Sequence, residues 1–78
     1  MYRRLRSLRE DLDLNQTDMA KLLNMSQTGY SQYETGTNDI PTSILIKLSR
    51  IHNVSVDYIL NLTDVKKPYE RKKEKIHN

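Results

Sequence analysis

The chain contains no cysteine, and this absence removes several classes of site at once. None of its 78 residues is a cysteine, so disulfides, thiolate-bound zinc, iron–sulfur clusters and thiol nucleophiles are excluded. Glycine and proline each occur only twice, and no Pro/Gly/Ser-rich linker divides the chain. We therefore expect one small domain with a modest core.

Long apolar runs are also missing, and Met1 is followed by charged residues instead of an apolar signal segment. Neither a membrane span nor a secretory signal is predicted. The expectation is a soluble cytoplasmic protein without a membrane partner.

The residues that catalysis needs are scarce. His52 and His77 are the only histidines, and neither belongs to a metal-ligand or triad spacing. Asp11 and Asp13 lie two positions apart, which does not place paired carboxylates on one helix face. No glycine-rich phosphate loop is present. The sequence therefore predicts no enzyme, no metal site and no cofactor.

Charge is distributed unevenly along the chain, although the total is only +3. Residues 1–65 carry seven basic and eight acidic side chains, whereas residues 66–78 carry six basic and two acidic ones. The net charges are −1 and +4. Any binding of nucleic acid by the first segment must then come from local placement of side chains, with the basic tail adding reach.

Residues 15–36, NQTDMAKLLNMSQTGYSQYETG, predict two short helices joined by a tight turn. Asn15 is a good N-cap, and Asp18 three residues later can complete a capping box. Asn24 tolerates the left-handed conformation that ends a helix. Ser26 can cap a second helix, which Gly36 ends. This order of features is typical of a helix-turn-helix.

The flanking segments also read as helices. Leu5, Leu8 and Leu12 recur at spacings of three and four, which predicts an amphipathic helix over residues 2–13. The turn-flanking helices cover 16–23 and 27–35. Pro41 favours the start of a fourth helix that reaches about His52, and Ser55 can cap a short fifth one. With no alternating β pattern, the predicted fold is compact and all-α, with five helices in residues 1–65 and a separate basic tail over 66–78.

These motifs resemble the lambda-repressor/Cro-like, or XRE, family of bacterial and phage helix-turn-helix regulators. The resemblance covers roughly residues 3–64: LRSLRE before the motif, NQTDMAKLL and MSQTGYSQYETG within it, and IP, LIKLS and VSVDYIL after it. It implies a five-helix domain that binds operator DNA, usually as a symmetric dimer. The motif spans about 16–35, and its second helix is the recognition helix.

The resemblance also assigns roles by position. Base-facing positions hold Gln27, Thr28, Ser31 and Gln32, and positions that contact or position phosphates hold Gln16, Ser26, Thr35, Thr37 and Asn38. Gln16 is further expected to brace the first recognition-helix residue. Arg9 and Glu34 match a pair that forms a structural salt bridge in relatives. The sequence departs from the family at Asn24, where glycine is common, and at Gly29, which is expected to cost the helix about 1 kcal/mol.

Small polar side chains suit this task, because a glutamine amide can pair bidentately with the N6/N7 edge of adenine. The same residues could instead be ordinary polar helix surface. Tyr30 is expected in the core. For Tyr33 two interpretations stay open: burial in the core, or a ring that packs while its hydroxyl reaches a phosphate. Arg3, Arg4 and Arg6 are either a solvated face or DNA contacts.

Three interpretations of the basic tail stay open: a disordered solubilising end, an arm that follows the DNA backbone, or a helix over 69–76 that joins two subunits. The predicted function is a sequence-specific, dimeric DNA-binding regulator. The simplest mechanism is that of a repressor that occupies an inverted-repeat operator. The alternative is a protein-interaction module or an antitoxin-type regulator that also holds a partner protein. The candidate dimer surface is the fifth helix, with Tyr58, Ile59 and Leu62.

Overall fold

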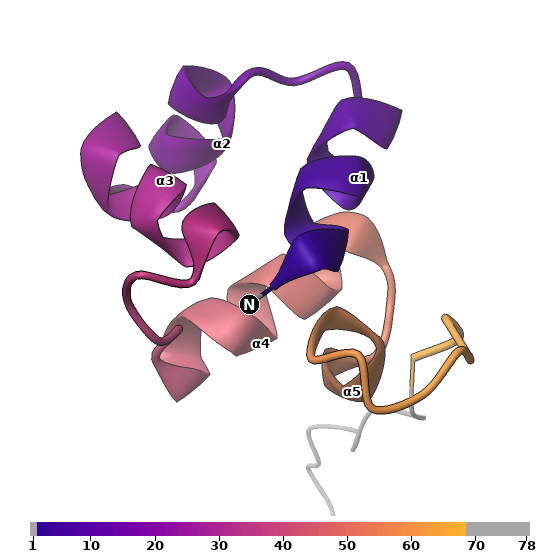
Figure 1. Ribbon diagram of the computed structural model, residues 1–78. Coiled ribbons are helices and arrows are strands. Elements are labelled where there is room, and N and C mark those ends of the chain that lie inside the picture. Colours follow the sequence, from indigo (N-terminus) through magenta and orange to yellow (C-terminus); the bar gives the residue numbers. More distant parts are fainter. Residues whose placement is uncertain (1, 69–78) are drawn as a thin grey trace, which may run out of the picture.

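Five helices and no strand make up the part of the chain that the computed structural model describes, residues 2–68 (Figure 1). The helices are α1 (Arg3–Asp11), α2 (Gln16–Leu22), α3 (Gln27–Thr35), α4 (Thr42–His52) and α5 (Val56–Ile59). The all-α prediction with five helices is thus confirmed, and each predicted range agrees within two residues. The expectations for a helical tail lie outside the described residues.

Local sequence explains where the helices begin. The Asn15 side chain accepts the Asp18 N–H at 2.8 Å and Asp18 accepts the Asn15 N–H at 3.3 Å, which completes the predicted capping box. Ser26 caps α3 by accepting the Gly29 N–H, and Ser55 caps α5 by accepting the Tyr58 N–H. Pro41 occupies the position just before α4 instead of its first turn. The capping residues therefore set the register of the helix-turn-helix.

The helix ends use residues that tolerate a positive φ. Asn24 has φ 57° in the turn between α2 and α3, and Gly36 has φ 80° after α3. Asp13 has φ 58°, which explains why α1 stops at Asp11 and does not reach residue 13. Short polar side chains and glycine are the residues that adopt this conformation at least cost.

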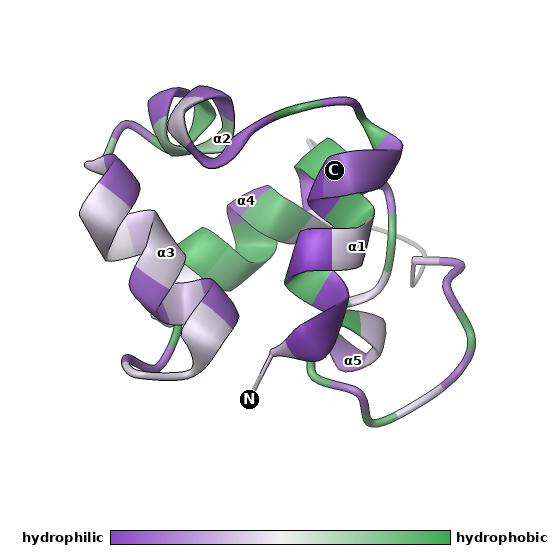
Figure 2. Ribbon diagram, turned by 45° about the horizontal axis from the view of Figure 1, so that its top comes forward, coloured by the Kyte–Doolittle hydropathy of each residue, from purple (hydrophilic) through white to green (hydrophobic). Residues whose placement is uncertain are grey.

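The core lies where the inner faces of all five helices meet. α2 packs on α3, α1 contacts both α3 and α5, and α4 contacts α5. Figure 2 shows hydrophobic colour concentrated on α4 and on one side of α1, while α3 is largely white and purple. Buried hydrophobic residues are Leu5, Leu8, Met19, Ala20, Leu23, Tyr30, Tyr33, Ile40, Leu48, Val54 and Ile59. Every helix contributes to this single core, so α3 is held rigidly on its inner side.

The structure corrects the candidate dimer surface on α5. Ile59 is fully buried in the core, and the Arg4 guanidinium covers the Tyr58 ring, with its central carbon 4.0 Å from the ring centroid. Of the three residues expected there, only Leu62 is largely exposed, at 71%. The helix is one turn long, and its apolar residues are needed inside the domain. The prediction that Tyr58, Ile59 and Leu62 together form an exposed dimer surface is therefore wrong.

Candidate nucleic-acid interface

The four side chains expected to face bases lie on one face of α3. Positions 27, 28, 31 and 32 share a side of an α-helix because they are separated by one, three, four or five residues. Gln27 and Thr28 are exposed, and Ser31 and Gln32 are partly exposed. The opposite face carries Tyr30 and Tyr33, which are buried. α3 therefore presents polar groups outward from a fixed apolar base.

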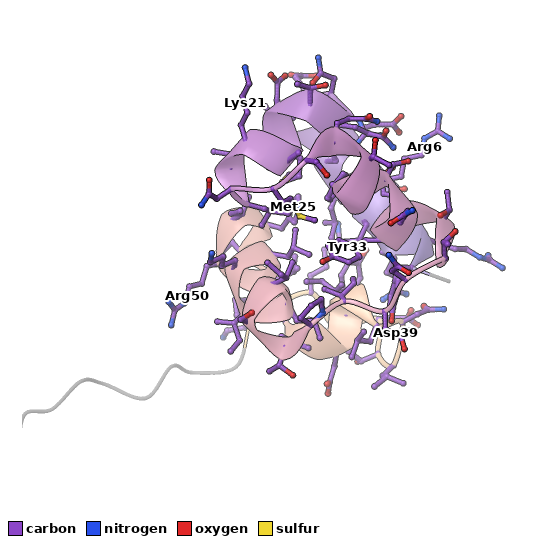
Figure 3. All side chains as sticks on the ribbon, turned by 90° about the vertical axis from the view of Figure 1, so that its left-hand side faces the viewer. Arg6, Lys21, Met25, Tyr33, Asp39 and Arg50 are labelled. Carbon is purple, nitrogen blue, oxygen red and sulfur yellow. The ribbon has the colours of Figure 1, made fainter. Side chains whose placement is uncertain are left out.

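The two tyrosines form that base. Their rings meet edge to face, with centroids 6.4 Å apart and planes at 86°, a favoured aromatic geometry. In Figure 3, Tyr33 lies towards the interior, whereas Arg6, Lys21 and Arg50 project away from the body of the domain. Met25 is partly buried against the core. Tyr33 is 8% exposed, so its ring packs in the core.

A buried ion pair joins α1 to the end of α3. Arg9 Nε donates to Glu34 Oε2 at 2.7 Å and Arg9 Nη2 donates to Glu34 Oε1 at 3.2 Å, and the side chains are 10% and 7% exposed. Arg9 Nη1 also donates to the Leu14 carbonyl at 2.9 Å. This bidentate geometry is the strong form of the arginine–carboxylate contact.

The environment of this pair keeps both groups charged. Burial alone would raise the pKa of Glu34, but its hydrogen bonds with Arg9 and Gln16 outweigh this effect and hold the pKa below its usual value. The hydrogen bond with Glu34 raises the pKa of Arg9 against the effect of burial. Burial raises the pKa of Tyr30, and Glu34 raises it further. A fixed negative charge therefore lies directly behind the polar face.

That charge is linked to the surface through two glutamines. Gln16, the first residue of α2, donates from Nε2 to Glu34 Oε1 at 3.0 Å. Gln27, the first residue of α3, donates from Nε2 to Gln16 Oε1 at 2.6 Å. The chain Glu34–Gln16–Gln27 thus runs from a nearly buried carboxylate to an exposed amide. It fixes the side chain that occupies the leading position of α3.

A second network links the end of α3 to the loop that follows it. Asn38 Nδ2 donates to Gln32 Oε1 at 2.7 Å, and the Asn38 N–H donates to the Gln32 carbonyl at 3.2 Å. The Thr35 and Thr37 hydroxyls share a hydrogen bond at 2.9 Å. The residues expected to meet phosphates after α3 are thus exposed and held beside Gln32. The loop and the helix form one continuous polar surface.

Gly29 has a packing role that the sequence did not reveal. A Cβ built at this position would lie 3.0 Å from Met25 Cε and 3.1 Å from Ser26 Oγ. Ser26 Oγ is the cap that accepts the Gly29 N–H at 3.0 Å. The missing side chain therefore makes room for the turn methionine and for the cap, so the glycine is more than a cost to helix propensity.

The arginines of α1 do not form one solvated face. Arg4 Nη1 donates to the carbonyls of Tyr58, at 3.0 Å, and of Thr63, and its Nη2 donates to Asp64 Oδ1 at 2.8 Å. Arg6 pairs with Glu10 one turn later at 3.2 Å on the surface. Arg4 thus fastens α1 to the segment after α5. Its partners are 54 to 60 residues away, and no local pattern in the sequence indicates them.

Neither a metal site nor a membrane span is found in the described residues. Within residues 2–68, no three histidine, cysteine or acidic side chains lie together in a way that could hold a metal ion. No helix in this part of the chain is long and apolar enough to cross a membrane.

The helix-turn-helix family model matches residues 5–59, a span that begins within α1 and ends with α5. Among curated proteins, the chain is 39% identical over 74 residues to YobD of Bacillus subtilis (strain 168), described as an uncharacterized HTH-type transcriptional regulator. It is 37% identical over 68 residues to the HTH-type transcriptional regulator ImmR of the same organism. A third relative there, YonR, is an uncharacterized regulator derived from the SPbeta prophage, 37% identical over 60 residues.

These alignments cover 94%, 87% and 77% of this chain, but only 66%, 54% and 56% of the respective relatives. The chain therefore spans between about half and two thirds of the length of the proteins it matches. No solved structure gives a significant match.

Proposed function

The chain belongs to the helix-turn-helix family of transcriptional regulators, and from this premise we propose that it binds double-stranded DNA in a sequence-specific way. In this proposal α3 enters the major groove and Gln27, Thr28, Ser31 and Gln32 contact base edges. Gln16, Ser26, Thr35, Thr37 and Asn38 contact or position the phosphate backbone. Transcription is then regulated, in the cytoplasm, by occupancy of a promoter.

The observation that carries the proposal is the exposed amide of Gln27 held by Gln16 at 2.6 Å. An unbound polar surface normally leaves long side chains free, because ordering them costs conformational entropy. Here the leading side chain of α3 is held by a hydrogen bond from a neighbouring helix of its own chain. Preorganised donors and acceptors at the start of an exposed helix suit the reading of base edges.

The charge of this region supports recognition by neutral groups. Between Asn15 and Pro41 the sequence has one basic residue, Lys21, against Asp18, Glu34 and Asp39. The motif itself cannot attract DNA as a basic surface does. Affinity for phosphates must come from amides, hydroxyls and the positive end of α3, with charge supplied by other segments.

The proposal includes a homodimer on an inverted repeat. Two copies of α3 would lie in successive major grooves on one side of the duplex, about 34 Å apart. Repression follows most simply, because a dimer on a promoter excludes polymerase.

Binding of a partner protein through α3 is the competing function. A protein-binding face usually presents an exposed apolar patch. Among the described residues, the large hydrophobic side chains that are exposed all lie outside α3, at Leu12, Leu22, Ile46, Leu62 and Val65. This distribution favours DNA as the ligand of α3 and leaves other faces for any protein partner.

The test is selection of bound duplexes from a random pool at two salt concentrations. Enrichment of an inverted repeat with half-sites one helical turn apart supports the proposal. Binding that disappears with salt and enriches no sequence would leave only attraction to the backbone and would overturn it. Gln27→Ala should relax base preference at one position per half-site. Gln16→Ala should weaken binding to all sequences because a phosphate contact is lost, and any change of base preference should be confined to the Gln27 position.

A further inference from the structure

The hydrogen-bond chain behind Gln27 has a fixed direction. An ionised carboxylate only accepts hydrogen bonds, whereas an amide has one donating and one accepting end. Since Gln16 meets Glu34 Oε1 at 3.0 Å, the Gln16 NH2 group must face Glu34. The Gln16 carbonyl oxygen then faces the other way, where it accepts from Gln27 Nε2 at 2.6 Å. The carboxylate thus determines which end of each amide points where.

This direction limits what Gln27 can offer to a base. One Nε2–H is used by Gln16, which leaves the second N–H and the carbonyl oxygen. Adenine presents the complementary pair in the major groove, an N7 acceptor beside an N6 donor. A reversed amide would place an N–H where the adenine amino group needs an acceptor. Guanine has its O6 acceptor at that place.

We propose that Glu34 is a positioning residue for base recognition: through Gln16 it fixes the orientation of the Gln27 amide and thereby makes Gln27 prefer adenine over guanine. The inference rests on the proposed function, because it concerns how the same face of α3 reads DNA. Glu34 itself touches no base. Its side chain is 7% exposed and acts from behind the surface.

Glu34 is held firmly enough for this role. Arg9 donates two hydrogen bonds to it from α1, so the carboxylate cannot turn away to follow the glutamines. Gln32 provides a contrast on the same helix. Its amide oxygen accepts from Asn38 Nδ2 at 2.7 Å, and Asn38 is another amide. Two amides can reverse together and keep their hydrogen bond, so no group fixes the polarity of Gln32.

The experiment compares Glu34→Gln with Arg9→Lys. Glu34→Gln keeps the shape of the side chain but adds a donor, so the orientation of the Gln16 amide is no longer fixed. Arg9→Lys weakens the ion pair and the link to Leu14 while leaving Glu34 a carboxylate. Both variants destabilise the fold, but only the first changes the polarity behind Gln27. The readout is the ratio of affinities for adenine and guanine at the base whose preference Gln27→Ala abolishes, measured below the unfolding temperature of each variant.

We expect the wild-type protein to prefer adenine by about tenfold or more, as a good bidentate contact does. Glu34→Gln should reduce this ratio to within roughly threefold of unity, and Arg9→Lys should keep it within roughly twofold of wild type. In the Gln27→Ala background, Glu34→Gln should change base preference no further. An unchanged ratio in Glu34→Gln, or an equal loss in Arg9→Lys, would overturn the inference.

A second variant covers the case in which Glu34→Gln does not fold. Gln16→Leu leaves the ion pair intact and removes the connection between Glu34 and Gln27. It should lower the adenine-to-guanine ratio as Glu34→Gln does, and a retained ratio would refute the role of the chain. A wild-type protein that enriches no sequence would instead overturn the proposed function, and this inference with it. Enrichment without adenine at the Gln27 position would overturn the inference alone.

Discussion

Two arginines on α1, five residues apart, fasten opposite sides of the domain in different ways. Arg9 reaches α3 and forms a bidentate pair with Glu34, with both side chains nearly buried. Arg4 reaches the segment after α5, where it meets two backbone carbonyls, the face of Tyr58 and Asp64. Arg4 is 20% exposed and its carboxylate partner 99% exposed. The charge of Arg9 is therefore balanced inside the protein, whereas that of Arg4 is balanced largely by water.

The difference bears on function as well as on stability. A buried pair is specific because removal of one partner strands the other charge. An exposed pair contributes little, because solvent screens it. On its α3 side, α1 thus holds the recognition helix through the Arg9–Glu34 pair, which stabilises the fold only when both partners are present. The α5 side is joined by several weaker contacts, each of which can be lost with smaller effect.

Glu34→Ala should have the largest effect. It leaves the Arg9 guanidinium buried without its carboxylate, and we expect the free energy of unfolding to fall by about 3–5 kcal/mol. For a domain whose total stability is on the order of 5–15 kcal/mol, much of the population would unfold near physiological temperature. Urea denaturation followed by circular dichroism measures the change. The control is Glu10→Ala, which breaks the exposed pair with Arg6 and should cost roughly 0.5 kcal/mol or less.

Arg4→Ala should follow, with a loss of about 1–2 kcal/mol. It removes charged hydrogen bonds to two carbonyls and the contact with the Tyr58 ring, of which each is worth on the order of 1 kcal/mol when partly solvated. The neighbouring Arg3 is exposed, so Arg3→Ala should change stability by roughly 0.5 kcal/mol or less. Equal losses in the two variants would show that the Arg4 contacts add nothing to the fold.

Acidification should weaken the contact between Arg9 and Glu34. The pKa of Glu34 in the folded protein is below its ordinary value of 4.5, so its stabilisation is present above that pH and is lost as pH falls through the folded pKa. Between pH 5 and pH 4 only part of this stabilisation is lost. The free energy of unfolding should therefore fall by less than it does in Glu34→Ala. Arg9→Met should flatten this part of the profile, because the carboxylate then has no charged partner.

His52 contributes separately at higher pH. Burial lowers the pKa of His52 from its ordinary value of 6.5, although Asp11 opposes the shift. The folded state therefore favours the neutral imidazole, and stability should decline as pH falls below about 6.5. His52→Gln should remove the decline in the free energy of unfolding between pH 7 and pH 5. It should leave unchanged the decline at lower pH that comes from Glu34. A single profile shared by wild type and His52→Gln would contradict this separation.

Asp64→Asn should have the smallest effect. The Asp64 side chain is almost fully exposed, and asparagine can still accept the hydrogen bond from Arg4. We expect the midpoint of urea unfolding to stay within experimental error of wild type. A loss as large as that of Arg4→Ala would mean that the ion pair, and not the carbonyls and the Tyr58 ring, holds the end of α5.

Much of the fold could be predicted because its signals are local. The Asn15–Asp18 capping box, the Ser26 and Ser55 caps and the left-handed Asn24 each depend on residues within about four positions. Helix propensity, capping and turn geometry act at that range. The error in the predicted end of α1 also has a local cause. The predicted helix reaches residue 13, whereas α1 ends at Asp11 because Asp13 has a positive φ.

The sequence by itself determined the helices, their order, the family, and which side chains of α3 point away from the core. Only the tertiary structure decided what those side chains touch. It placed Ile59 in the core, directed Arg4 to partners more than fifty residues away, and joined Glu34, Gln16 and Gln27 into one chain with a fixed direction. Hydrogen bonds within a turn follow from neighbouring residues, but contacts between helices depend on how every helix packs around the common core.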